Sequence, residues 1–189
     1  MAVPKKHIAI VDAWRAPEAR AFFRNVWPMY VHEISGFDTE FYVLDETGRW
    51  RPDIVEDWIS SATPPENLRV ARAEQDPAQP FQRAHVITDD GRPVGFICVG
   101  VQPFKFMPTD ADVQVAEFFL IRAARGAETA ACALALVLRR YPGRWHLRAI
   151  HDNVRAVRFW RRVLPAARIR DLEESREGGD VVFRFVADG

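Results

Sequence analysis

Cysteine is scarce in this chain, long hydrophobic runs are missing, and neither charge sign predominates. The two cysteines, Cys98 and Cys132, lie in apolar runs without metal-ligand spacing, so the sequence indicates no zinc or other metal site. We expect two buried small hydrophobic residues, with a disulfide or a reactive thiol as the alternative. Since no stretch of about 18 apolar residues exists, we expect no membrane span. The first residues lack the apolar core of a signal peptide, and this predicts a cytoplasmic protein.

The balance of charge argues against a general nucleic-acid-binding protein. The 26 basic residues equal the 26 acidic ones, whereas such proteins usually carry a basic excess. A local basic patch within a neutral total stays open. Hydrophobic residues make up 48% of the chain and aromatic residues 12%, which is enough for a full core. A length of 189 residues predicts one domain over 1–189.

Hydrophobic periodicity predicts an α/β protein with antiparallel hairpins at both ends. We expect strands at 7–11, 113–121 and 144–150, hairpins at 83–101 and 167–186, and helices at 17–34, 53–61, 127–141 and 153–164. The pair Asp90-Gly91 suits a tight hairpin turn. Pro28 should kink or split the first helix because it removes a backbone donor. Residues 61–80 hold four prolines and should contain one or two helical turns or form a mobile lid.

One stretch, "VAEFFLIRAARGAETAACALALVLRR" (115–140), combines a strand, a small-residue turn and a helix. The first amides of a helix lack backbone partners, and the helix dipole places partial positive charge there. A phosphate group fits such a place, and Arg122 and Arg125 add positive charge. Every strand–helix unit has a turn, however, so this feature alone favours a structural interpretation.

Two neighbouring patterns give the turn a more specific meaning. The residues A-E-F-F precede it, and a strand–helix unit with the pattern N-x-x-A-x-x-F-W, formed by Asn153, Ala156, Phe159 and Trp160, follows it. Together they resemble the GNAT superfamily of acyl-CoA-dependent N-acyltransferases, and within it the bacterial predicted acetyltransferases. The resemblance is clear over 83–165 and vague over the first 80 residues. It implies a mixed, mostly antiparallel sheet of six to seven strands, flanked by helices, with a splay between two central parallel strands.

The resemblance also implies acetyl-CoA or coenzyme A as co-substrate. Pantetheine would lie between the splayed strands and pair with the backbone near 119–122, and the pyrophosphate would lie on the turn at 125–130. The residues implied to bind it are Phe119, Leu120, Ile121, Arg122, Arg125, Gly126, Ala127, Glu128, Thr129, Ala130, Asn153, Phe159 and Trp160.

Glu117 is the candidate catalytic residue. The resemblance implies direct attack of a primary amine on the thioester, and some members of the superfamily carry a general-base glutamate in this A-E context. Partial burial would raise the pKa of the carboxyl enough for it to accept the amine's proton. Alternatively, Glu117 pairs with a nearby arginine or bonds to the sheet. The acceptor would be a small-molecule or protein amine, and a homodimer is possible.

The sequence departs from the family pattern at two positions. In the phosphate-loop pattern [QR]-x-x-G-x-[GA], Arg125 and Ala130 fit, but Glu128 replaces the glycine and brings negative charge toward the pyrophosphate. If the pattern is shifted by two residues, Gly126 takes the glycine position, but the first position is then no longer filled by Arg125. Trp160 stands where many members have a tyrosine that protonates the leaving thiolate, which tryptophan cannot do. We expect Trp160 in the core or pocket wall.

Other polar residues leave several interpretations open. His146 fits a satisfied or surface residue of a strand, whereas His151, at the strand end, has a possible functional role. Glu33 and the neighbouring His32, Asp38 and Glu40 either attract a cationic amine or form a solvated face. Tyr30 and Tyr42 are further candidates for the group that protonates the leaving thiolate. Two alternative functions remain: a degenerate CoA-binding or scaffold protein of the same fold, and an enzyme that transfers a longer acyl chain.

Overall fold

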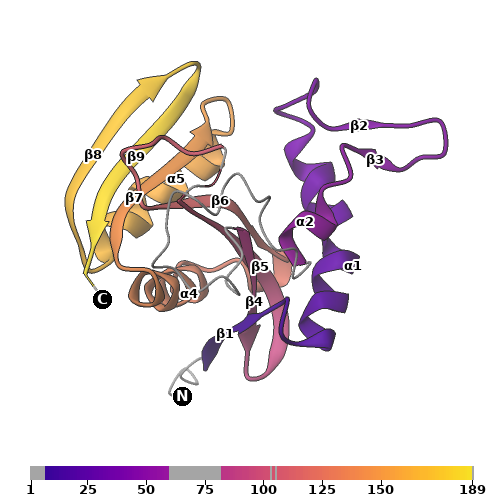
Figure 1. The fold of residues 1–189 in the computed structure, drawn as a ribbon, viewed down its shortest axis with the longest axis horizontal. Coiled ribbons are helices and arrows are strands. Elements are labelled where there is room, and N and C mark those ends of the chain that lie inside the picture. The colour runs from indigo at the N-terminus through magenta and orange to yellow at the C-terminus, as the bar shows by residue number, and fades with distance from the viewer. Residues whose placement is uncertain (1–6, 60–81, 103, 105, 189) are drawn as a thin grey trace, which may run out of the picture.

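The computed structural model describes residues 7–59, 82–102, 104 and 106–188, and a seven-stranded sheet forms its centre (Figure 1). The strand order is β1-β4-β5-β6-β7-β9-β8. The strands are β1 (Ile8–Asp12), β4 (Gln82–Asp89), β5 (Arg92–Val101), β6 (Val113–Leu120), β7 (Gly143–Ile150), β8 (Ile169–Glu177) and β9 (Asp180–Ala187). All neighbours are antiparallel except β6 and β7, so the predicted mixed sheet is confirmed.

Helices cover both faces of the sheet (Figure 1). They are α1 (Pro17–Ile34), α2 (Val55–Ile59), α4 (Ala127–Arg140) and α5 (Val154–Val163). One core, with Leu134 and Trp160, joins α4 and α5 to the sheet, and a second, with Phe23 and Phe96, joins α1 to the opposite face. The small hairpin of β2 (Val43–Leu44) and β3 (Trp50–Arg51) extends from the body at the upper right of Figure 1.

The two parallel strands separate soon after they meet. Only Val113–Val115 of β6 pair with Trp145–Leu147 of β7. Beyond this point β6 continues to pair with β5, and β7 with β9, but β6 and β7 no longer pair with each other. The predicted splay is therefore present, at the carboxyl ends of both strands.

A β-bulge in β6 decides which face Glu117 occupies. Cys98 of β5 lies opposite Glu117, and the next residue, Val99, lies opposite Val115, so Ala116 is the extra residue. Side chains alternate along a strand, and an unbroken strand would turn Glu117 to the same face as Val115, toward α4. The bulge shifts this alternation and turns Glu117 toward α1.

Two local predictions differ from the structure. The predicted split of α1 at Pro28 is absent, because burial of the apolar stripe of this helix, including Phe23, Trp27 and Val31, against the sheet offsets the missing backbone bond. Cys132 is exposed, since it lies off the stripe by which α4 meets the sheet, whereas Cys98 is buried as predicted, and both cysteines are free. In the last hairpin, predicted at 167–186, β8 runs to Glu177 and the turn lies at Gly178 and Gly179.

Elsewhere the predicted elements agree with the structure to within a few residues. At the 83–101 hairpin, Asp90 and Gly91 both have positive φ, at 49° and 76°, as a tight turn requires. The predictions for 61–80 lie outside the described residues.

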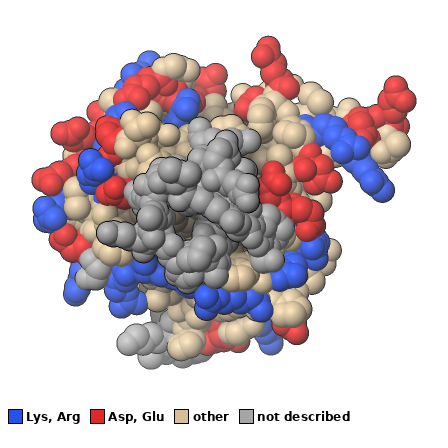
Figure 2. Space-filling model, in the orientation of Figure 1, with Lys and Arg blue, Asp and Glu red and all other residues tan. Residues whose placement is uncertain are grey.

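None of the described helices is long and apolar enough to span a membrane. On the face drawn in Figure 2, acidic and basic side chains are interspersed over the described surface.

Candidate active site

Glu117 lies in a partly buried, aromatic setting between β6 and α1. The hydroxyl of Tyr30, from α1, donates a hydrogen bond to Glu117 Oε2. The ring of Tyr30 lies 5.5 Å from that of Phe96 and 6.1 Å from that of Phe119, both in edge-on contact. No described residue forms an ion pair with Glu117, so the alternative of an arginine partner does not hold within the described chain.

This setting adjusts the acidity of the carboxyl. Burial raises the pKa of Glu117 from its ordinary 4.5 to about 7, while the hydrogen bond from Tyr30 opposes the rise. A carboxyl with a pKa near neutrality is ionised in about half of the molecules at pH 7 and can accept or release a proton. The sequence anticipated this rise in pKa.

Neighbouring groups stay protonated. Burial, together with the charge of Glu117, raises the pKa values of Tyr30, Tyr42 and Cys98 well above their ordinary ranges. Cys98 lies opposite Glu117 on β5, at 0% exposure. Glu117 is therefore the group in this cluster that titrates near neutral pH.

The turn after β6 leads to the N-terminus of α4, where the sequence predicts an anion site. A short 3₁₀ helix (Arg122–Ala124) follows the strand, and Gly126 forms the N-cap of α4 without any side-chain bond. A side chain added at Gly126 would meet nothing within 4 Å, so the backbone is open to an incoming group. Of the other predicted residues, Glu128 is exposed in the first turn, while Thr129 and Ala130 are fully buried.

Arg125 takes a different position from the one expected. Its Nη2 lies 2.7 Å and 2.8 Å from the two carboxylate oxygens of Glu33 in α1, and its Nε donates to the carbonyl of Leu120 at 2.8 Å. Its guanidinium also lies 5.6 Å from the ring centre of Phe119. Arg125 thus ties the turn to α1, across the end of β6.

The N-x-x-A-x-x-F-W pattern forms one side of the splay. Asn153 caps α5, because its Oδ1 accepts from the amide of Ala156 at 3.1 Å. Phe159 stacks on Phe118 of β6 at 5.5 Å, and Trp160 meets the same ring edge-on at 5.4 Å. Trp160 is 5% exposed, in agreement with a place in the core or pocket wall.

Comparison with known proteins shows what this arrangement is similar to. No protein-family model and no curated protein matches the chain. Solved structures do match, although at low sequence identity. An acetyltransferase assigned to the GNAT family from Desulfovibrio desulfuricans shares 14% identity over 96% of this chain and 100% of its own, with a TM-score of 0.55. The chain has the GNAT fold. An aminoglycoside 6′-acetyltransferase of type Ii shares 10% identity over 97% and 98%, with a TM-score of 0.56.

Within the GNAT fold, the predicted site residues occupy two neighbouring regions. Glu117 faces α1, as does Phe119, whose ring contacts Tyr30, whereas the other residues predicted to hold CoA lie at the end of β6, in the turn into α4 and at α5. The backbone amide of Ile121 donates to Val94 on the β5 side, so the amide and the carbonyl of Leu120 point to the opposite side, toward the splay, where the carbonyl accepts from Arg125 Nε. These assignments stay predictions.

The residues present fit a CoA-like ligand. The splay leaves backbone groups of β6 without strand partners on the side of β7, and the open backbone at Gly126 leads to the first amides of α4. Two features oppose the fit: Arg125 is held by Glu33, and the carboxylate of Glu128 lies in the turn that would meet the pyrophosphate. Both side chains are on the surface, where they can change conformation.

The sequence indicates Tyr30 as a candidate residue but cannot predict its contact with Glu117. Tyr30 and Glu117 are separated by 87 positions, and only the packing of α1 on the sheet brings them together. The histidines lie elsewhere: His146 is buried and bonds to Gln114 at 3.2 Å, as a satisfied residue should, and His151 is exposed beside Arg176. Of the acids near α1, Glu33 is bound to Arg125, so the site retains less negative charge than the sequence suggested.

Proposed function

We propose that this chain is an acyl-CoA-dependent N-acyltransferase that transfers an acetyl group to a primary amine. One observation carries the proposal: a carboxyl with a pKa of about 7, Glu117, lies in β6 just beyond the point where β6 and β7 stop pairing. The GNAT fold supplies the context, because the matched structures named above are acetyltransferases.

Glu117 would act as the general base. An amine is mostly protonated at neutral pH and must lose a proton before it can attack a carbonyl carbon. Tyr30 donates to Oε2, and no described residue donates to Oε1, which makes Oε1 the oxygen for the acceptor's proton. Acetyl-CoA would supply the acyl group as a thioester: the C–N bond forms, the C–S bond breaks, and CoA leaves as a thiolate that takes its proton from water.

The surroundings of Glu117 contribute in two ways. Tyr30 holds the carboxyl in one orientation, and the rings of Phe96 and Phe119 keep its environment poor in water. A desolvated carboxylate is a stronger base than one in water, which favours proton transfer from an ammonium group. The open backbone at Gly126 and the first amides of α4 would bind the pyrophosphate, with Asn153, Phe159 and Trp160 positioned along the splay.

The first test is titration calorimetry with acetyl-CoA and, separately, with CoA. Micromolar binding supports the proposal and leads to an amine screen, in which Glu117→Gln should lower the rate at least several-fold and leave CoA binding intact. An unchanged rate would remove the assignment of Glu117 as base. No binding at millimolar ligand would overturn the proposal.

A second candidate is a GNAT-fold protein that binds CoA or a partner without transfer. The engagement of Arg125 by Glu33 and the glutamate at position 128 favour it, since both weaken the phosphate site. Glu128→Gly separates the two candidates: we expect tighter CoA binding and faster transfer if the first is right. CoA binding without transfer to any amine, in this variant and the parent chain, would favour the second.

A further inference from the structure

A cavity outside the Glu117 cluster opens on the same face of the sheet. Its volume is about 460 Å³, and it lies between the loop that follows β5 and the strands β7 and β9. Its lining includes Phe106, Met107, His146, Arg148, Glu177 and Arg184. The loop residues supply an apolar wall, and the strand residues supply charge.

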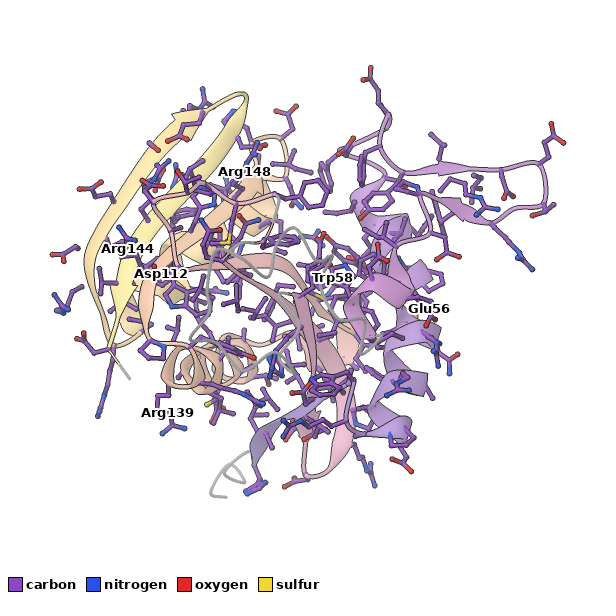
Figure 3. All side chains as sticks on the ribbon, viewed as in Figure 1. Glu56, Trp58, Asp112, Arg139, Arg144 and Arg148 are labelled. Atoms are coloured by element: carbon purple, nitrogen blue, oxygen red, sulfur yellow. The ribbon has the colours of Figure 1, made fainter. Side chains whose placement is uncertain are left out.

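The cavity and Glu117 lie along the same face of the sheet. His146, in its lining, bonds to Gln114, and the bulge at Ala116 returns Glu117 to the face of Gln114. Glu117 lies three positions beyond Gln114, or roughly 10 Å along the strand. Arg148 stands one residue beyond the last parallel pair, at the level of the splay (Figure 3). A small molecule of about this length would have its amine at Glu117 and its other end at the cavity.

The lining is positively charged and arranged for carboxylates. It contains two guanidinium groups and one carboxylate, that of Glu177. Arg184 already binds both oxygens of Glu177, at 2.6 Å and 3.0 Å, and Arg148 binds Asp180 with Nε at 3.0 Å. Guanidinium groups present a planar fork that matches a carboxylate, so both arginines can exchange one carboxylate for another.

The pKa of His146, in the cavity lining, also reflects the positive charge of the two arginines. Burial lowers the pKa of His146, and the charges of Arg184 and Arg148 lower it further, with smaller opposing effects of Glu177 and Asp110. His146 is therefore neutral at pH 7 and adds no charge of its own. The arginine charges outweigh the acidic ones at this point of the cavity.

We propose that this cavity binds a carboxylate of the acceptor, so that the acceptor is an amino acid whose amine and carboxylate are roughly 10 Å apart. Arg148 and Arg184 bind the carboxylate, and Phe106 and Met107 pack against the chain between the two groups. The inference rests on the proposed function, because it assigns the other end of the acceptor that Glu117 deprotonates.

The substrate test compares three amines of equal length: 8-aminooctanoate, octylamine and 1,8-diaminooctane. A charge-assisted hydrogen-bonded pair contributes enough for a tenfold or greater preference. We therefore expect kcat/KM for 8-aminooctanoate to exceed that for both other amines by about tenfold or more. Equal values for the three amines would overturn the cavity assignment and leave the transferase function intact.

Variants connect that preference to the cavity. Arg148→Gln and Arg184→Gln should each reduce the preference for 8-aminooctanoate over octylamine toward one, mainly through KM. Arg161→Gln is the matched control, since Arg161 is an exposed arginine of α5 that binds Glu174 and lies outside the cavity lining. Loss of the preference in the control as well, or its retention in both cavity variants, would refute the inference.

Calorimetry with 8-aminooctanoate alone separates this inference from the proposed function. If no amine is acetylated and CoA does not bind, the proposed function fails. The carboxylate site in the cavity is then tested by the affinity for 8-aminooctanoate alone. The wild-type chain should then bind 8-aminooctanoate at least tenfold more tightly than either cavity variant. Equal affinity in wild type and variants, or equal affinity for octylamine, would overturn the carboxylate site.

Discussion

The free energy of unfolding should record the unusual acidity of Glu117, independently of any activity. In the folded chain the pKa of Glu117 is about 7, against an ordinary 4.5 in the unfolded chain. Between these values the folded state binds more protons than the unfolded state, so the free energy of unfolding falls as pH rises from 4.5. The loss is complete above pH 7, where Glu117 is ionised in both states. The gap of about 2.5 pKa units corresponds to about 3 kcal/mol.

Glu117→Gln removes this cost because glutamine does not ionise. We expect the stability of the variant relative to wild type to be about 2.5 kcal/mol greater at pH 8.5 than at pH 5, where part of the cost is already present. In melting temperature this amounts to roughly 5–10 °C for a chain of this size. Comparing two pH values cancels any constant effect of the new amide.

Urea denaturation at both pH values, followed by circular dichroism, measures the difference. The control is Glu174→Gln, because the hydrogen bond from Arg161 holds the pKa of Glu174 below its ordinary value. Glu174 is mostly ionised in both states from pH 5 to 8.5, so its replacement should have nearly the same effect at both. An effect of Glu117→Gln that does not change with pH would refute the raised pKa and, with it, the case for Glu117 as a base at neutral pH.

Three further substitutions test separate parts of the argument. Tyr30→Phe removes the bond that lowers the pKa of Glu117, so the acidic limb of kcat/KM should move up by about one pH unit, and an unmoved limb would contradict the contact. Gly95→Ala would place a methyl group 2.1 Å from the carbonyl oxygen of Phe119, and urea denaturation should show a loss of about 2–4 kcal/mol; a loss below 1 kcal/mol would show that β5 can move away. Asn153→Ala should cost about 1 kcal/mol through its cap, without altering the pH profile, whereas an altered profile would give Asn153 a role beyond capping.

Local patterns were sufficient for the elements of this fold. The strand and helix boundaries follow from alternation, from helical periodicity and from residues such as Asn153, whose side chain caps the helix at the predicted place. Pro28 shows the limit of such rules, because tertiary burial of α1 outweighs the missing backbone bond. The exposure of Cys132 shows another, since a cysteine among alanines looks buried unless the helical face is worked out.

The site required information that no local pattern contains. Glu117 faces α1 only because Ala116 is an extra residue in β6, and the pairing of Cys98 with Glu117 reveals the bulge. Tyr30 reaches that carboxyl from another helix, and nothing in its sequence neighbourhood indicates it. The cavity at Arg148 and Arg184 likewise depends on two strands that are neighbours in space and distant in sequence.

The short parallel seam between β6 and β7 has a consequence for how the chain opens. Among the described residues, three pairs, from Val113 to Val115, are the only strand pairing between β1-β4-β5-β6 and β7-β9-β8, while each group has long antiparallel ladders of its own. We expect the two groups to behave as separate cooperative units in hydrogen exchange, with the seam amides exchanging first. Glu117 belongs to one unit and Arg148 to the other. Mild denaturant should therefore abolish acceptor binding while most of the secondary structure is still intact.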